Sequence, residues 1–163
     1  MSEHIVYLGL GSNLGERARN LEESLERIAE LARIEKKSRI YETEPWGLKN
    51  QPNFLNQVVR VKSGLKPLEL LSALKNIEKT MGRKKSVKYG PRLIDLDILF
   101  YDDLVMKTDK LTIPHPLLTQ RAFVLVPLNE IAPNHLHPVE GKKIKELNES
   151  IDQRSIWRWK EQP

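Results

Sequence analysis

The sequence contains no cysteine in its 163 residues. This absence excludes disulfide bonds and cysteine-ligated zinc sites, and it is typical of a protein from a reducing compartment. The sequence also lacks any apolar stretch of about 18 residues, the length that a membrane-spanning helix requires. Its first residues, MSEHIVYLGLGSN, pass directly into a strand-like segment. We therefore expect a soluble cytoplasmic protein without a membrane partner.

Repeats, low-complexity segments and linkers are absent as well. A chain of this length can bury about two-thirds of its unfolded surface, so residues 1–163 are expected to form a single domain. The net charge of +5 is modest and suits an anionic small molecule as well as a nucleic acid. The position of the positive charge therefore matters more than its total.

The pattern of apolar residues predicts the order β-α-β-β-α-β. The strands are expected at residues 5–8, 34–41, 56–62 and 93–101. The helices are predicted from Leu21, Leu25, Ile28 and Leu31, and then, after Pro67, from Leu70, Leu74, Ile77 and Met81. This order is typical of a ferredoxin-like α+β fold, an antiparallel sheet with helices packed on it. Beyond residue 102 we expect a short helix within 117–131 and a C-terminal extension.

Two aspartates interrupt the last predicted strand. Because strand side chains alternate, Asp95 and Asp97 point to the same face, with their backbones roughly 7 Å apart. Leu93 and Leu99 are expected to flank them on that face. The opposite face is expected to carry Ile94, Leu96, Ile98 and Phe100. A carboxylate among apolar neighbours is costly unless it is solvated, hydrogen-bonded or bound to a cation.

A basic segment, RKKSVKYGPR, directly precedes the aspartates. Residues 83–92 contain five cationic side chains and no acidic one. Taken alone, this segment is a solvated loop, and the aspartates are either a metal site or an exposed polar strand face. Together they offer what a polyphosphate with magnesium requires, carboxylate oxygens for the metal and cations for the phosphates. The adjacency favours a phosphate and metal site.

The segment GLGSNLG, residues 9–15, has two look-alikes among phosphate-binding motifs. It differs from a dinucleotide-binding fingerprint because Leu14 occupies the place of the third glycine. It is not a P-loop either, because no Gly-Lys-Ser/Thr follows. We interpret it as a turn from strand to helix that needs the conformational freedom of glycine.

Residues 88–99, KYGPRLIDLDIL, resemble the signature of the 6-hydroxymethyl-7,8-dihydropterin pyrophosphokinase family. The resemblance continues, in order, through GLGSNLG, YETEPWG, QPNFLNQVV, IEKTMGR, TIPHP and RAFVLVPLNEIAP, within residues 5–133. It implies the same ferredoxin-like fold. It also implies transfer of pyrophosphate from ATP to the hydroxymethyl oxygen of the pterin, with release of AMP, in the folate pathway.

The resemblance further implies a nucleotide site. Asp95 and Asp97 would hold two Mg²⁺ ions that bridge the triphosphate of ATP, and Asp95 would accept the hydrogen bond of the attacking hydroxyl. Arg83 and Arg92 would join them as catalytic residues, Arg92 also contacting ATP. The other implied ATP contacts are Glu78, Tyr89, Ile98, Lys110, Thr112, His115 and Arg121. From the residues alone, a turn histidine in Pro-His-Pro is the favoured interpretation of His115, and the resemblance reverses that preference.

The pterin site is implied in the same way. A flat heterocycle suits aromatic faces, and its amino-pyrimidinone edge suits an amide. The implied pterin contacts are Thr43, Pro45, Trp46, Phe54, Asn56, Asp95 and Phe123. Taken singly, the aromatic residues and the asparagine are better interpreted as core packing or a strand-end amide, so their role at the pterin depends on the resemblance. Departures from the family pattern are Lys84, Lys85, Tyr89 and Pro116.

Two other functions remain to be weighed. An RNA-recognition module shares the predicted order of elements, but it stacks bases on aromatic residues of its central strands. The central strand here offers aspartates, which would repel a phosphate backbone in the absence of metal. A non-catalytic nucleotide sensor would bind ATP yet release no AMP. We therefore expect small-molecule partners, ATP and the pterin, no nucleic acid, and a monomer.

Overall fold

The computed structural model describes residues 3–45, 50–82 and 92–159. The strands in this part of the chain are β1 (His4–Ser12), β2 (Arg33–Lys37), β3 (Tyr41–Thr43), β4 (Phe54–Ser63), β5 (Asp95–Tyr101), β6 (Met106–Lys107), β7 (Thr112–Ile113) and β8 (Ile156–Arg158). The helices are α1 (Arg17–Ile28), α2 (Pro67–Thr80), the 3₁₀ turn η1 (Leu118–Gln120), α3 (Ala122–Ile131) and α4 (Ile144–Glu149). No helix among these residues is long and apolar enough to cross a membrane.

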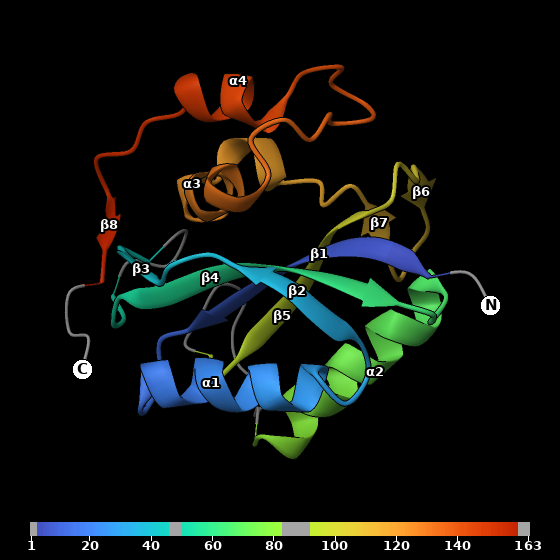
Figure 1. Ribbon diagram of the computed structural model, residues 1–163. Coiled ribbons are helices and arrows are strands. Elements are labelled where there is room, and N and C mark those ends of the chain that lie inside the picture. The colour runs from blue at the N-terminus through green and yellow to red at the C-terminus, as the bar shows by residue number, and fades with distance from the viewer. Residues whose placement is uncertain (1–2, 46–49, 83–91, 160–163) are drawn as a thin grey trace.

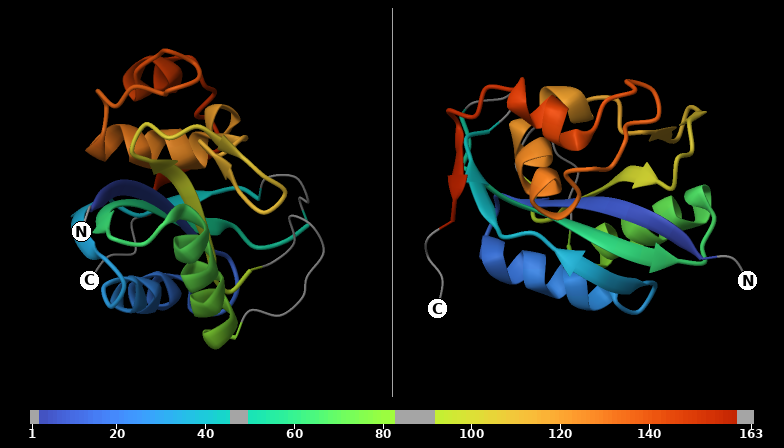
Figure 2. Two further views of the ribbon diagram at one scale, coloured as in Figure 1. Left: turned by 90° about the vertical axis from the view of Figure 1, so that its right-hand side faces the viewer. Right: turned by 45° about the horizontal axis from the view of Figure 1, so that its top comes forward.

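An antiparallel sheet forms the middle layer of the molecule. Its strands follow the order β5-β1-β4-β3-β8, and β2 pairs with β4 on the same side as β3. Helices α1 and α2 cover one face of the sheet, while α3 covers the other face and α4 lies beyond it (Figures 1 and 2). The predicted mixed fold with an antiparallel sheet and packed helices is confirmed.

The two long helices begin and pack as their sequences predict. Helix α2 begins at Pro67, and the side chain of Glu69 accepts a hydrogen bond from the N–H of Lys66 at 2.9 Å. Its apolar face is buried against the sheet through Leu70, Leu74 and Ile77. Helix α1 buries Leu21 and Ile28, which lie two turns apart, in the same cluster. These contacts fix α1 and α2 on one face and leave the other face for the site.

The structure corrects two of the predicted side-chain orientations, and a register shift in β5 accounts for one of them, that of Phe100. Leu8 pairs with Ile98 but Tyr7 pairs with Phe100, so β5 carries one extra residue at Leu99. A bulge of this kind reverses the alternation that follows it. Phe100 therefore packs in the cluster under α3, and the prediction that it points with Ile98 is wrong. Leu93 packs against the cluster under α1 and α2 rather than beside the aspartates.

The segment 9–15 is also different from its prediction. Gly9 and Gly11 lie inside β1, and the residue of this segment with positive φ is Gly15, at 71°. The turn therefore occupies only the end of the segment, where the chain enters α1. The glycines of β1 serve another purpose, because they lie beside the aspartates of β5.

The segment after residue 131 is more ordered than its sequence indicates. Helix α4 packs on α3 through Ile144 and Leu147, and β8 then pairs with β3 (Figure 1). The predicted strand 34–41 is divided into β2 and β3, and the predicted helix within 117–131 into η1 and α3. The chain thus returns, through β8, to the edge of the central sheet.

Candidate active site

A pocket of about 390 Å³ lies between the sheet and the segment that leads into α3. Nine residues of the predicted site line it: Thr43, Phe54, Asn56, Arg92, Asp95, Asp97, His115, Arg121 and Phe123. They come from β3, β4 and β5, from Arg92, which lies three residues ahead of β5, and from the segment 115–123. The structure therefore brings these nine residues, some implied as phosphate contacts and some as pterin contacts, together in one pocket.

Two glycines form the middle of the pocket floor. Gly9 pairs with Asp97, and Gly11 pairs with Asp95 on one side and Asn56 on the other. Directly paired residues share a face of the sheet, so glycine leaves open space beside each carboxylate. A Cβ atom on Gly11 would lie 3.0 Å from Oδ1 of Asn56, which is too close without a shift. The glycines therefore allow the aspartates and the amide to face a common space.

The carboxylates of β5 fit a divalent cation. Burial, followed by the charge of Asp95, raises the pKa of Asp97 to about 7, while Arg121 opposes the shift. Two adjacent carboxylates that disfavour one another's charge attract a cation, and carboxylate oxygens are the ligands that Mg²⁺ prefers. Within the described residues, no group of three or more His, Asp or Glu side chains forms a closed metal site. Mg²⁺ usually keeps several positions for water and phosphate, so a carboxylate pair suits it.

His115 offers a hydrogen-bond donor on the opposite wall. Its Nδ1 accepts a hydrogen bond from the backbone N–H of Leu117 at 3.2 Å, and the backbone N–H of His115 donates to the carbonyl of Leu99 at 3.1 Å. Burial, followed by the charge of Arg121, lowers the pKa of His115 to about 4, while Asp95 opposes the shift. The ring is therefore neutral at pH 7 with its proton on Nε2. In this form it donates one hydrogen bond and adds no charge.

Arg121 and Phe123 lie next to His115 at the start of α3. The guanidinium carbon of Arg121 lies 5.2 Å from the centre of the Phe123 ring, within the range of a cation–π contact. This contact orients a cation and an aromatic face into the same pocket. Phe54 of β4 lines the pocket from the sheet side. The two aromatic residues therefore come from opposite walls.

The amide of Asn56 is held by its neighbour in the sheet. Its Nδ2 donates a hydrogen bond to Oγ1 of Thr43 at 2.8 Å, and both side chains are buried. This contact fixes the orientation of the amide and places Oδ1 near Gly11. An oriented amide at a pocket wall can recognise a ligand edge that carries both donors and acceptors.

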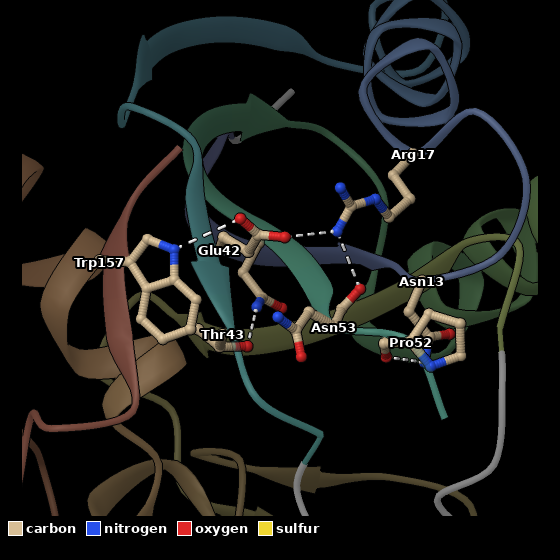
Figure 3. Close-up of polar contacts among 8 residues, drawn as sticks. Asn13, Arg17, Glu42, Thr43, Pro52, Asn53 and Trp157 are labelled. Atoms are coloured by element: carbon tan, nitrogen blue, oxygen red, sulfur yellow. Dashed lines mark hydrogen bonds and ion pairs between the residues drawn. The ribbon is translucent and has the colours of Figure 1, made fainter. Parts of the chain in front are cut away.

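A polar cluster outside the pocket ties β3 to three other elements (Figure 3). Glu42 accepts hydrogen bonds from Nη1 of Arg17 in α1 at 2.9 Å and from Nε1 of Trp157 in β8 at 3.3 Å. Arg17 also donates to the carbonyl of Asn53 at 3.0 Å, just before β4. Because Thr43 follows Glu42 directly, this cluster fixes the strand that orients the Asn56 amide.

Glu78 is a predicted nucleotide contact that does not line the pocket. It is buried on α2, and its Oε2 accepts a hydrogen bond from the N–H of Leu96 at 2.7 Å. Its Oε1 lies 3.4 Å from Nζ of Lys75. Since Leu96 lies between Asp95 and Asp97, the carboxylate of Glu78 holds the strand that carries them.

The remaining predicted residues do not line the pocket or are not described. Ile98 packs in the core under α1 and α2. Lys110 is exposed in the turn between β6 and β7, and Thr112 lies in β7. Pro45 follows β3 and is absent from the pocket lining. Three predicted residues lie outside the described residues: Trp46, Arg83 and Tyr89.

Sequence reasoning missed the two glycines of the floor. The signal that could have revealed them is their spacing, because glycines two positions apart in an apolar strand indicate a close approach on one face. Gln57 and Val58 also line the pocket, and their sequence context carries no comparable signal, whereas Leu99 lines it beside the aspartates as predicted.

Comparisons with known proteins agree with this geometry. Residues 7–133 match the family described as 7,8-dihydro-6-hydroxymethylpterin-pyrophosphokinase (HPPK). The chain is 50% identical to the 2-amino-4-hydroxy-6-hydroxymethyldihydropteridine pyrophosphokinase of Aquifex aeolicus, over 87% of this chain and 89% of the relative. It is 46% identical to the folic acid synthesis protein FOL1 of Dictyostelium discoideum, over 83% of this chain.

Some of these proteins are much longer than the chain. The chain spans 20% of the Dictyostelium protein. A crystal structure of Plasmodium falciparum HPPK-DHPS, with pterin and p-hydroxybenzoate, is similar in fold with a TM-score of 0.77 and 19% identity. That similarity covers 96% of this chain and 47% of the Plasmodium chain.

Proposed function

Because the chain belongs to the 7,8-dihydro-6-hydroxymethylpterin-pyrophosphokinase family, we propose that its pocket binds ATP and the pterin side by side. The reaction is transfer of the pyrophosphoryl group of ATP to the hydroxymethyl group of 6-hydroxymethyl-7,8-dihydropterin, in folate biosynthesis. The observation that carries the proposal is the meeting of Asp95, Asp97 and His115 with Phe54 and Asn56 in one pocket.

One half of the pocket suits the triphosphate. We assign Asp95 and Asp97 as ligands of two Mg²⁺ ions, which would neutralise phosphate charge and polarise the reacting phosphorus when bound. Arg92 and Arg121 supply fixed positive charge to phosphate oxygens, and neutral His115 donates a hydrogen bond from Nε2. The donors and charges of this half are therefore complementary to a metal-bound triphosphate.

The other half suits the pterin. Phe54 and Phe123 offer aromatic faces from opposite walls, and the Asn56 amide, oriented by Thr43, faces the edge of the ring system. A pterin held there would place its hydroxymethyl group toward β5, since Asn56 and Asp95 flank Gly11. The hydroxymethyl group of the pterin and the phosphates of ATP would thus meet beside Gly9 and Gly11.

The proposed transfer is an in-line displacement at the β-phosphorus. The hydroxymethyl oxygen forms a bond to this phosphorus as the bond to the α,β-bridging oxygen breaks, and AMP leaves with that oxygen. Asp95 accepts the hydrogen bond of the hydroxyl group, whose proton passes to solvent. Arg92, Arg121 and His115 stabilise the charge that moves onto the bridging oxygen.

The finer features of the sequence analysis belong to the same proposal. The strand order β5-β1-β4 with β2 and β3 outside supports a ferredoxin-like core followed by a C-terminal extension. We further propose that the protein is a monomer. Sedimentation at micromolar concentration tests the monomer directly.

Phosphorus NMR of the products tests the proposed chemistry. The protein, ATP, Mg²⁺ and the pterin alcohol should yield AMP and a pterin pyrophosphate. Appearance of ADP with a pterin monophosphate would contradict attack at the β-phosphorus. Formation of AMP and free pyrophosphate would contradict transfer to the pterin.

A further inference from the structure

Asn13 is the residue directly after β1 and is absent from the pocket lining. It belongs to the segment GLGSNLG, and its side chain is 1% exposed. Strand β1 runs between β5 and β4 and is antiparallel to both, so its end lies beside the beginnings of these two strands. Asn13 therefore lies where the phosphate half and the pterin half of the pocket meet.

The first set of contacts joins Asn13 to Arg92, which lies three residues ahead of β5. Its backbone N–H donates to the carbonyl of Arg92 at 3.0 Å, and the N–H of Arg92 donates to Oδ1 of Asn13 at 2.7 Å. These two bonds close a small ring between the residues. The backbone that leads to Asp95 and Asp97 is thus held at its first residue.

The second set joins the same side chain to the segment ahead of β4. Nδ2 of Asn13 donates to Oε1 of Gln51 at 2.8 Å and to the carbonyl of Pro52 at 3.0 Å, the latter drawn in Figure 3. Both hydrogens of the amide are used here, while its oxygen serves Arg92. An aspartate could accept from Arg92 but could donate to neither partner, and a shorter side chain could not reach both.

We propose that Asn13 is a positioning residue that fixes the phosphate half of the pocket relative to the pterin half, without touching either substrate. The inference rests on the proposed function, because that function defines the two halves. Each half is assembled by its own strand and its own contacts, such as the bond between Asn56 and Thr43. Loss of the Asn13 bridge therefore changes the alignment of the halves more than the composition of either.

Alignment is what an in-line transfer requires. A misplacement of about 1 Å between reacting groups can reduce a rate about 100-fold, although each partner still binds. The signature of Asn13 is thus a fall in kcat with little change in the two binding constants. A residue with only a structural role would lower the folded fraction and leave activity per folded molecule unchanged.

The sharpest variant is Asn13→Asp, which keeps the acceptor for Arg92 and removes both donors. We expect kcat to fall about 100-fold, while calorimetric Kd values for a non-hydrolysable Mg²⁺–nucleotide and for the pterin, each measured alone, change less than about threefold. Gln51→Ala, which removes one of the bonds, should lower kcat about fivefold and is milder for folding. The matched control is Asn20→Ala, which loses two bonds of the same segment, to Ser12 and Leu14, and should keep its kcat.

Each outcome of these measurements either supports or contradicts the positioning role of Asn13. A wild-type kcat in Asn13→Asp, or equal losses in kcat and in both affinities, would overturn the positioning role. If Asn13→Asp does not fold, an unchanged kcat in Gln51→Ala would overturn it instead. Failure of the wild-type protein to form AMP would contradict the proposed function itself, so the two failures are distinguishable.

Discussion

The backbone N–H of Leu96 donates a hydrogen bond of 2.7 Å to the buried carboxylate of Glu78. Leu96 lies between the two aspartates of β5, and its side chain packs under the sheet with α2. The Glu78 carboxylate on α2 therefore anchors β5 from one face of the sheet, while Asp95 and Asp97 line the pocket on the other face.

Replacing Glu78 tests this relationship. Glu78→Ala would leave the buried N–H of Leu96 without this partner, so the free energy of unfolding should fall by about 1–3 kcal/mol. Glu78→Gln keeps a carbonyl acceptor and should lose less. Urea unfolding measures both. The control is Lys75→Ala, which removes an exposed ion partner of Glu78 and should cost less than about 1 kcal/mol. An alanine variant as stable as the wild type would contradict the role of the carboxylate.

The amide of Asn56 should be specific for one substrate. Asn56→Ala removes the oriented donor and acceptor of the pterin half, so pterin binding should weaken by roughly 1–3 kcal/mol. Binding of the Mg²⁺–nucleotide should stay nearly unchanged, because Asn56 lies on β4 and the phosphate residues on β5 and beyond. Calorimetry with each ligand alone separates the two. Equal losses for both ligands would indicate a structural asparagine.

The raised pKa of Asp97 predicts a pH dependence of stability in the absence of metal. Because its pKa lies near 7 in the folded protein and near 3.8 in the unfolded chain, the folded state holds the extra proton between these values. The contribution of Asp97 to stability therefore decreases as the pH rises from about 4 to about 7. Asp97→Asn should be more stable than the wild type at pH 8, and the difference should shrink toward pH 4.5.

Unfolding in urea at the two pH values, with chelator present, measures this difference. Added Mg²⁺ should stabilise the wild type more than Asp97→Asn at pH 8, because a bound cation offsets the negative charge of the deprotonated Asp97 side chain. A difference that is independent of pH would contradict the shifted pKa.

The periodic spacing of apolar and charged residues predicted those elements whose formation depends on neighbouring residues in the sequence. The helix that begins at Pro67 and the common face of Asp95 and Asp97 followed from spacing alone, because the helical and strand periods fix which side chains share a face. The position of Phe100 could not follow, since a bulge depends on the partner strand. Short elements such as α4 and β8 form against partners distant in sequence, so their own residues carry little signal.

The site was predicted unevenly for the same reason. The aspartates were evident from the residues, whereas the pterin contacts depended on the family resemblance. Gly9 and Gly11 were assigned to a turn, because the strand that lies beside them begins 84 residues after Gly11. The role of Asn13 could not be predicted from neighbouring residues, because its hydrogen-bond partners lie 38 to 79 residues away in the sequence. Contacts of this range appear only once the sheet is assembled.

The carboxylates of β5 offer the most direct test of the whole account. Asp95→Asn and Asp97→Asn keep the size of each side chain and remove the charge that would hold Mg²⁺. Turnover, measured as AMP formed per folded molecule, should fall at least about 100-fold in each variant, while pterin binding in Asp97→Asn stays near that of the wild type. Turnover at the wild-type rate in either variant would contradict the assignment of this pocket as the active site.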